Sequence, residues 1–150
     1  MLTDTTIKRL NTLGAISKEG KSVNGLFRLM ENPVIWKVAY ANIYSNKGAL
    51  TKGINDVTLD GFSYERIEKI ISKLKTGEYK FSPVRRVYIP KKNGKKRPLG
   101  IPNADDKLTQ EVIRIILSEI YEPIFSDKSH GFRRNRSCHT ALAQVQKSWT

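Results

Sequence analysis

The chain has 150 residues, 39% of them hydrophobic, and a formal charge of +13 that comes from 27 Lys and Arg against 14 Asp and Glu. That is enough chain for one folded domain, and it contains neither an apolar run near the ~20 residues of a membrane span nor an apolar secretory segment after Met1. The single cysteine, Cys138, excludes an internal disulfide and a cysteine-rich zinc site, and it fits a reducing, cytoplasmic location.

The first 60 residues predict helices followed by a loop. Apolar residues at helical spacing favour two short helices before residue 31, on either side of a polar break at 17–25. Asn32 as the N-cap and Pro33 at the first helical position begin a clearer helix, which we expect to end within 44–48. Residues 45–60 then form a polar loop that has neither a helical nor a strand period.

A helix and a β-hairpin are predicted after this loop. Ser63 is expected to cap the helix, and Gly77 is expected to end it in a left-handed conformation. From Val84 the apolar period becomes two, and Asn93-Gly94 provides a strong turn signal between two such runs. The pattern therefore predicts a small antiparallel hairpin.

Two further helices are predicted in the last third of the chain. Asn103 is expected to cap a helix whose first turn carries Asp105 and Asp106, and we expect this helix to be the most buried element, since apolar residues cover most of its circumference. Pro123 ends it, and after a basic loop Ser137 caps a last helix, which has no terminal capping residue and so suggests a piece of a longer protein. Together the elements predict an α+β fold, mostly helical with one small antiparallel β-hairpin.

The basic excess is concentrated in two places, residues 85–97 and residues 128–136. Cations at fixed spacing along a strand can meet successive phosphates, whereas an edge strand protected by charge needs only one or two of them. The excess therefore indicates a polyanionic partner, most often nucleic acid, with an anionic membrane surface as the weaker alternative. The cations are Arg85, Arg86, Lys91, Lys92, Lys95, Lys96 and Arg97 in the first place and chiefly Arg133, Arg134 and Arg136 in the second.

Other reactive and aromatic side chains have ordinary interpretations. The two histidines fit polar contacts better than a metal site, and we expect Cys138 to be buried. Trp36, Tyr40 and Tyr44 at helical spacing favour core packing over base stacking. For Phe132 in the basic loop, a contact with a nucleic acid or nucleotide is about as well supported as an ordinary structural role.

Several motifs occur together in one order along the chain: Ile89-Pro90-Lys91, Arg97-Pro98-Leu99-Gly100, Asp106-Lys107-Leu108, Ser129-His130-Gly131-Phe132-Arg133 and His139-Thr140-Ala141-Leu142. With them, residues 85–102 resemble the first conserved block of group II intron reverse transcriptases, also called maturases, and residues 106–142 resemble the second. Residues 44–49 are similar to the N-terminal extension motif of the same family. The combination is far more specific than any single Gly or Pro motif.

The resemblance implies the fingers subdomain of a right-hand polymerase, with an N-terminal extension over residues 1–60 and the fingers over 61–150, truncated before the palm. Lys91 and Arg97 match family positions that bind the triphosphate of the incoming deoxynucleotide, and Arg85 matches one that contacts the template. The loop that begins at Asn46 matches the family's lid over the template. The candidates for RNA or template binding are Arg85, Arg86, Lys92, Lys95, Lys96, Arg133, Arg134, Arg136, Asn46, Lys47 and Gly48.

The implied activity is RNA-directed DNA synthesis together with intron splicing and mobility. The implied partners are group II intron RNA, an RNA template with a DNA primer, and deoxynucleoside triphosphates, with no membrane partner. The family's Mg²⁺ ions are held by Asp residues that do not occur in this chain, so we expect no catalytic or metal-binding residue here and no polymerase activity from this segment alone. The adjacent Asp105 and Asp106 fit a helix N-terminus better than a metal site.

Two other functions stay open from the sequence: a splicing-only, RNA-binding maturase module without polymerase activity, and a small basic protein of the ribosomal kind. A last helix that is cut off exposes apolar surface, which also leaves a homodimer open.

Overall fold

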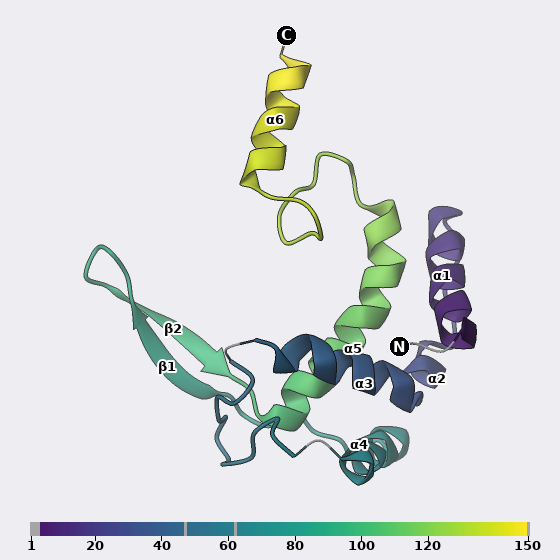
Figure 1. Ribbon diagram of the computed structural model, residues 1–150, viewed down its shortest axis with the longest axis vertical. Helices are drawn as coiled ribbons and strands as arrows, with labels where there is room; N and C mark the ends of the chain where they lie inside the picture. Colours follow the sequence, from purple (N-terminus) through teal and green to yellow (C-terminus); the bar gives the residue numbers. More distant parts are fainter. Residues whose placement is uncertain (1–3, 47, 62, 150) are drawn as a thin grey trace.

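The computed structural model describes residues 4–46, 48–61 and 63–149 (Figure 1). The elements are α1 (Asp4–Lys18), α2 (Leu26–Met30), α3 (Pro33–Tyr44), α4 (Tyr64–Thr76), β1 (Arg85–Pro90), β2 (Lys96–Ile101), α5 (Ala104–Tyr121), the 3-10 turn η1 (Glu122–Ile124) and α6 (Cys138–Ser148). Helices α1 to α4 lie around one long central helix, α5, while α6 stands apart from them, and a two-stranded hairpin projects from the base of α5.

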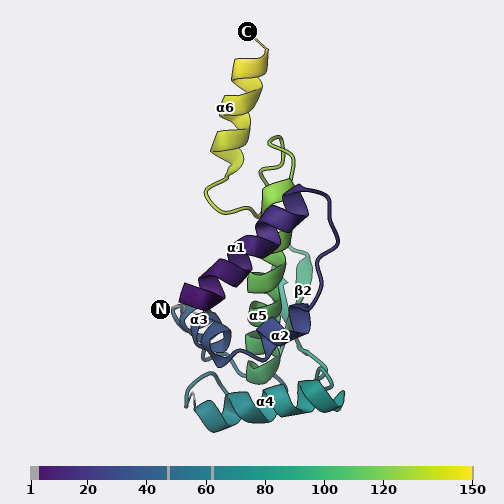
Figure 2. The same ribbon diagram turned by 90° about the vertical axis from the view of Figure 1, so that its right-hand side faces the viewer.

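Helix α5 is the centre of the core. Helices α1, α2 and α3 and the turn η1 pack against it, and α4 lies across its N-terminal end against α3 (Figures 1 and 2). Leu108, Val112 and Ile116 of α5 are buried, as is the largest core side chain, Trp36 of α3. The predicted burial of α5 is thus confirmed along one side of the helix, whereas Leu117 on its other side is 39% exposed.

The predicted caps fix the helix boundaries, with one exception. The side chains of Asn32 and Ser63 accept hydrogen bonds from the amides two and three residues on, Ser137 forms a reciprocal capping box with Thr140, and Gly77 ends α4 at φ 73°. Asn103 stands at the N-cap position of α5 but makes no capping hydrogen bond with its side chain. That part of the prediction is wrong because the Asn103 amide oxygen is bound by the loop that precedes α4.

The hairpin has the predicted position and turn. Its strands pair antiparallel, with Arg85 opposite Ile101 and Ile89 opposite Arg97. All residues of the two strands except Val87 and Ile101 are exposed. A two-stranded sheet with so little burial is marginally stable by itself, so the anchoring of its base to α5 determines where it points.

The last helix stands apart from the core (Figure 1). Leu142 and Trp149 on its apolar face are 67% and 86% exposed. Cys138, at its start, is exposed, so the predicted burial of this cysteine is wrong. The predicted core packing of the α3 aromatics is confirmed for Trp36, which is buried, and for Tyr40, which is partly buried against the core, and it is wrong for Tyr44, which is 44% exposed at the end of the helix. Within the described ranges, no helix is both long and apolar enough to cross a bilayer.

Candidate nucleic-acid interface

The projecting hairpin presents most of its cations to solvent. Because residues directly opposite each other in an antiparallel pair point to the same side, Arg85, Ile89 and Arg97 share one face of the hairpin. Six of the seven cations form no side-chain hydrogen bond or ion pair among the described residues, and all six are exposed. These six are Arg86, Lys91, Lys92, Lys95, Lys96 and Arg97; we call them the hairpin cations.

A hydrogen-bonded turn holds the tip of the hairpin. The Lys91 amide donates to the Lys95 carbonyl at 2.7 Å, and the Gly94 amide donates to the Lys91 carbonyl at 3.1 Å. The Asn93 side chain accepts from the Lys95 amide at 3.2 Å, and Gly94 has φ 75°, which glycine adopts without strain. The lysine side chains at the tip therefore extend from a fixed backbone toward solvent.

Asp106, in the first turn of α5, anchors the base of the hairpin. Its carboxylate is buried and accepts hydrogen bonds from the Tyr79 hydroxyl at 2.8 Å and from the Ser82 amide at 3.1 Å. Burial raises the pKa of the Tyr79 phenol, which keeps it a neutral donor. Asp105 pairs with Arg66 at 2.6 Å.

Both acids of this turn therefore have protein partners. In the part of the chain that the structure describes, no three His, Cys, Asp or Glu side chains are grouped so as to hold a metal ion. The described acids do not fit Mg²⁺.

The main chain of residues 48–58, which we call the lid loop, is held by side chains of three other elements. Lys107 of α5 donates to the carbonyls of Gly48 at 3.1 Å and Thr51 at 2.6 Å. Arg85 of β1 donates to the Lys52 carbonyl through two nitrogens, at 3.1 and 2.9 Å. Asn103 accepts from the Ile54 and Asn55 amides at 2.8 and 3.3 Å, and Arg66 of α4 donates to the Thr58 carbonyl at 3.0 Å.

The role of Lys107 was not predicted from the sequence, in which this residue stands only within a motif. A cation in the first turn of a helix is disfavoured by the helix dipole, and this is the signal that could have identified it. Burial, and then the neighbouring charge of Arg85, lower the pKa of the Lys107 amine. Lys107 and Arg85 thus join the lid loop to α5 and to the hairpin.

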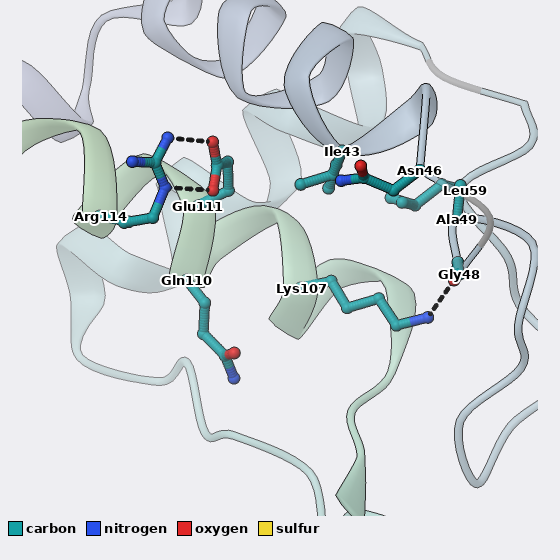
Figure 3. A pocket seen from close by; sticks show the side chains of 9 residues that line it. All are labelled: Ile43, Asn46, Gly48, Ala49, Leu59, Lys107, Gln110, Glu111 and Arg114. Atoms are coloured by element: carbon teal, nitrogen blue, oxygen red, sulfur yellow. Dashed lines mark hydrogen bonds and ion pairs between the residues drawn. The ribbon is translucent and has the colours of Figure 1, made fainter. Parts of the chain in front are cut away.

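A hollow of about 510 Å³ lies between the lid loop, the end of α3 and α5 (Figure 3). Its apolar wall includes Ile43 and Leu59, and its polar wall includes Asn46 and the ion pair of Glu111 with Arg114 at 2.7 Å. Burial would raise the pKa of Glu111, but hydrogen bonds from Arg114 and Asn42 hold it below the usual value.

Two of the three predicted lid residues line this hollow. Asn46 and Gly48 both line it, whereas Lys47 lies outside the described residues. The Asn46 side chain donates to the Asn42 carbonyl at 3.3 Å, and the Gly48 carbonyl accepts from Lys107.

The three arginines of the second basic loop differ in their contacts. The Arg133 side chain is only 8% exposed and forms an ion pair with Glu122 at 2.8 Å. Arg136 donates to the Asp127 carbonyl and pairs with its carboxylate at 3.3 Å. Arg134 is exposed and has no hydrogen-bonded or ion-pair partner within residues 4–46, 48–61 and 63–149. Of the three, Arg134 is the one whose guanidinium group is not already bound by the protein.

His130 connects this loop to the last helix, in agreement with the polar contact expected of it. Its Nδ1 lies 2.9 Å from the Thr140 hydroxyl, and its Nε2 contacts the Gln144 side chain. The loop is thereby attached to α6 on one side, while Arg133 attaches it to the end of α5 on the other.

Comparisons with known proteins show which sequences this chain resembles. The sequence model of the family described as "Reverse transcriptase (RNA-dependent DNA polymerase)" matches residues 89–150. The chain is 62% identical over 125 residues to the group II intron-encoded protein LtrA of Lactococcus lactis subsp. cremoris, an alignment that covers 83% of this chain and 21% of LtrA.

Two fungal proteins are also similar. An uncharacterized 91 kDa protein in the cob intron of Schizosaccharomyces pombe is 44% identical over 143 residues, 91% of this chain and 18% of that protein. The putative COX1/OXI3 intron 1 protein of Saccharomyces cerevisiae is 43% identical over 123 residues, 82% of this chain and 15% of that protein. The chain thus spans only 15–21% of the length of these three relatives.

Proposed function

Because this chain belongs to the reverse transcriptase/maturase family of group II introns, we propose that it binds intron RNA and an RNA template with its DNA primer. It is the fingers region of the protein, mostly helical with one antiparallel hairpin. In this proposal residues 1–60 form the N-terminal extension and residues 61–150 the fingers. The chain contributes contacts to the phosphates of the incoming deoxynucleotide during RNA-templated DNA synthesis, and it takes part in splicing and mobility of the intron.

The observation that carries the proposal is the group of hairpin cations, which are exposed and without protein partners among the described residues. Phosphoryl transfer is catalysed mostly by positioning and by cations that stabilise the charge on the transferring and leaving phosphates. Lys91 and Arg97 are proposed to bind the triphosphate. A guanidinium group can hold a phosphate by two parallel hydrogen bonds, which a lysine ammonium cannot do.

Arg85 is proposed to contact the template from the junction of two elements. Its guanidinium group already donates to the Lys52 carbonyl of the lid loop, so a template strand that reaches Arg85 also reaches the lid. The remaining hairpin cations, together with Arg134, are proposed to contact the RNA backbone. Arg133 and Arg136, which are bound to protein partners, are proposed to act at the same surface by shaping the loop.

The metal ions of the reaction are proposed to be held elsewhere in the protein. Both carboxylate oxygens of Asp106 accept hydrogen bonds, from Tyr79 and Ser82, and one oxygen of Asp105 accepts from Arg66, which favours a structural role for these two acids. None of the roles proposed for the residues of this chain involves a metal ion. Its residues bind and orient RNA and nucleotide.

The first experiment measures RNA affinity of the protein that carries this chain as a function of salt. If about five cations contact single-stranded phosphates, the log–log slope is near −3.5, and each lost contact lowers its magnitude by about 0.7. Replacing Lys95 and Lys96 by Ala should reduce the slope. The matched control replaces Lys69 and Lys73 of α4, which are also exposed. A salt-independent affinity would refute the proposal.

The second experiment separates nucleotide from template contacts in primer extension. Arg97→Ala should mainly raise the apparent KM for the deoxynucleotide, whereas Arg85→Ala should weaken template binding. Equal losses of RNA affinity in both variants, with no nucleotide defect, would contradict the assignment of Lys91 and Arg97. RNA binding and splicing without any DNA synthesis would instead identify a splicing-only maturase.

A further inference from the structure

Phe132 combines a strained backbone with a fully exposed aromatic ring. Its φ is 56°, in the left-handed region that side chains larger than Asn or Asp rarely occupy. Within the part of the chain that the structure describes, its side chain is fully exposed, so no described residue buries the ring and offsets the strain. A strained conformation persists only where the surrounding structure imposes it, and such residues cluster at sites of binding and catalysis.

The next residue imposes this conformation. The Arg133 guanidinium is buried and donates to the Glu122 carboxylate at 2.8 Å and to the carbonyls of Ser126 at 2.9 Å and Ser129 at 3.1 Å. It also lies 5.3 Å from the centre of the Phe125 ring. The chain on the C-terminal side of Phe132 is therefore fixed by a charged group that binds both the end of α5 and the start of the loop.

The preceding side of the loop is fixed as well. His130, two residues before Phe132, contacts Thr140 and Gln144 of α6 through its two ring nitrogens. With both flanks held, the backbone at Phe132 is fixed, and the ring extends from it toward solvent. This rigidity lowers the entropic cost of a contact between the ring and a ligand.

An aromatic, apolar hollow adjoins the ring. Phe132 lines a space of about 380 Å³ together with Leu117, Tyr121 and Phe125. The rings of Tyr121 and Phe125 are stacked there, with centroids 6.3 Å apart and planes inclined by 21°. Flat apolar walls of this kind accept a planar aromatic ligand, and exposed aromatic rings stack on nucleobases with little regard to sequence.

The charge around the ring favours a nucleic acid over a protein partner. Residues 128–136 contain Lys128, Arg133, Arg134 and Arg136 and no acidic residue. Arg133 and Arg136 are paired with acids, but Arg134, two residues after Phe132, is exposed and has no ion-pair partner in the described chain. A base on Phe132 would thus have a cation available for its own phosphate.

We propose that Phe132 is a base-stacking residue that takes an unpaired base of the RNA strand, with Arg134 at the adjoining phosphate. This assignment rests on the proposed function, because it names the part of the RNA that one loop of the same interface binds. It adds a contact with a base face to an interface otherwise made of phosphate contacts.

The test uses the protein that carries this chain and a single-stranded RNA that contains a fluorescent adenine analogue whose emission is quenched by stacking. Phe132→Asn removes the ring and tolerates the left-handed backbone. It should lower RNA affinity about 5- to 140-fold, the range for one lost base–aromatic stack, and abolish the quenching. Phe132→Tyr should keep both. The matched control is Asn135→Gly, since Asn135 has φ 59° in the same loop, and its affinity should equal that of the wild type.

Two further readouts separate stacking from other roles of the ring. The log–log salt slope should be unchanged in Phe132→Asn and smaller in magnitude in Arg134→Ala, because only the second variant loses a phosphate contact. The melting temperature of Phe132→Asn should equal or exceed that of the wild type, since the substitution relieves strain without exposing apolar surface. A lower melting temperature would overturn the proposal, because it would show that the ring packs against protein.

The outcomes also distinguish this proposal from the proposed function. If Phe132→Asn binds RNA like the wild type while the Lys95 and Lys96 variants bind it less tightly, base stacking is refuted and the phosphate-binding function stands. If the wild type shows no salt-sensitive RNA binding, both are refuted. Quenching in the same sequence made as DNA would extend the site to unpaired bases of either strand.

Discussion

Substitution of Gly53 by alanine tests how the lid loop is fixed to α5. Gly53 is buried, and its backbone lies against Asn103, the residue just before α5. A Cβ atom added at Gly53 would lie 2.1 Å from the Asn103 amide oxygen, 2.8 Å from its Cα and 2.9 Å from its nitrogen. Because two of these three atoms belong to the main chain, rotation of the Asn103 side chain cannot remove the clash.

The expected loss of stability follows from the displacement of Asn103 that the added Cβ atom requires. Displacement of the Asn103 side chain breaks its hydrogen bonds to the Ile54 and Asn55 amides, at 2.8 and 3.3 Å, and each bond is worth about 1 kcal/mol. The remaining backbone overlap adds about 1–2 kcal/mol, as in other overpacked sites. Gly53→Ala should therefore lower the free energy of unfolding by about 3 kcal/mol, which corresponds to roughly 6–12 °C in melting temperature.

Urea and thermal unfolding of Gly53→Ala measure this loss. Gly48→Ala is the matched control, since Gly48 lies in the same loop with no atom within 4 Å of an added Cβ and without a positive φ. Asn103→Ala combined with Gly53→Ala should be less destabilising than the sum of the two single variants, because the substitutions share the same lost hydrogen bonds. A Gly53→Ala protein as stable as the Gly48→Ala control would refute this packing of the loop.

Three further predictions concern single side chains of α5 and α6. Glu111→Gln should be less stable than the wild type at neutral pH, because the folded-state pKa of Glu111 is lowered. This difference in stability should shrink as the pH falls below the ordinary Glu pKa of 4.5, and unfolding curves recorded across pH measure it. Asp106→Ala leaves the Tyr79 hydroxyl and the Ser82 amide without an acceptor, so we expect a loss of about 3 kcal/mol and faster amide exchange at the base of the hairpin. Cys138 is exposed and should react with a maleimide in the folded protein at a rate close to that of an unfolded control, whereas slow labelling would show that it is covered.

Local signals in the sequence were sufficient for most of the element boundaries. Asn32 with Pro33, Ser63, Gly77 and the Asn93-Gly94 turn each act within a few residues of themselves, so the pattern contains the information that the structure uses. The helical periods also predicted the burial of α5 and of Trp36.

Long-range partners were not predictable in the same way. Asn103 has the sequence features of a cap, but its side chain binds a loop about 50 positions earlier in the chain. Lys107 stood only within a motif and Arg133 was a candidate for RNA binding, yet the first holds the lid loop and the second is buried against Glu122. Their partners are main-chain carbonyls and a distant acid, and neither leaves a periodic pattern in the sequence.

The isolation of the hairpin gives salt two opposite effects on this region. The six hairpin cations, which have no partner among the described residues, lie on the two exposed strands and in the turn between them, where they repel one another; added ions screen that repulsion within a Debye length of about 10 Å at 0.1 M. Salt therefore tightens the hairpin as a folded unit while it weakens the attraction of the same cations for phosphate. A polyphosphate chain supplies the missing counter-charge locally and removes the repulsion at the moment of binding. If the hairpin cations bind phosphates as proposed, ordering of the hairpin and phosphate binding form one coupled equilibrium, and the hairpin is least ordered when ionic strength is low and no ligand is bound.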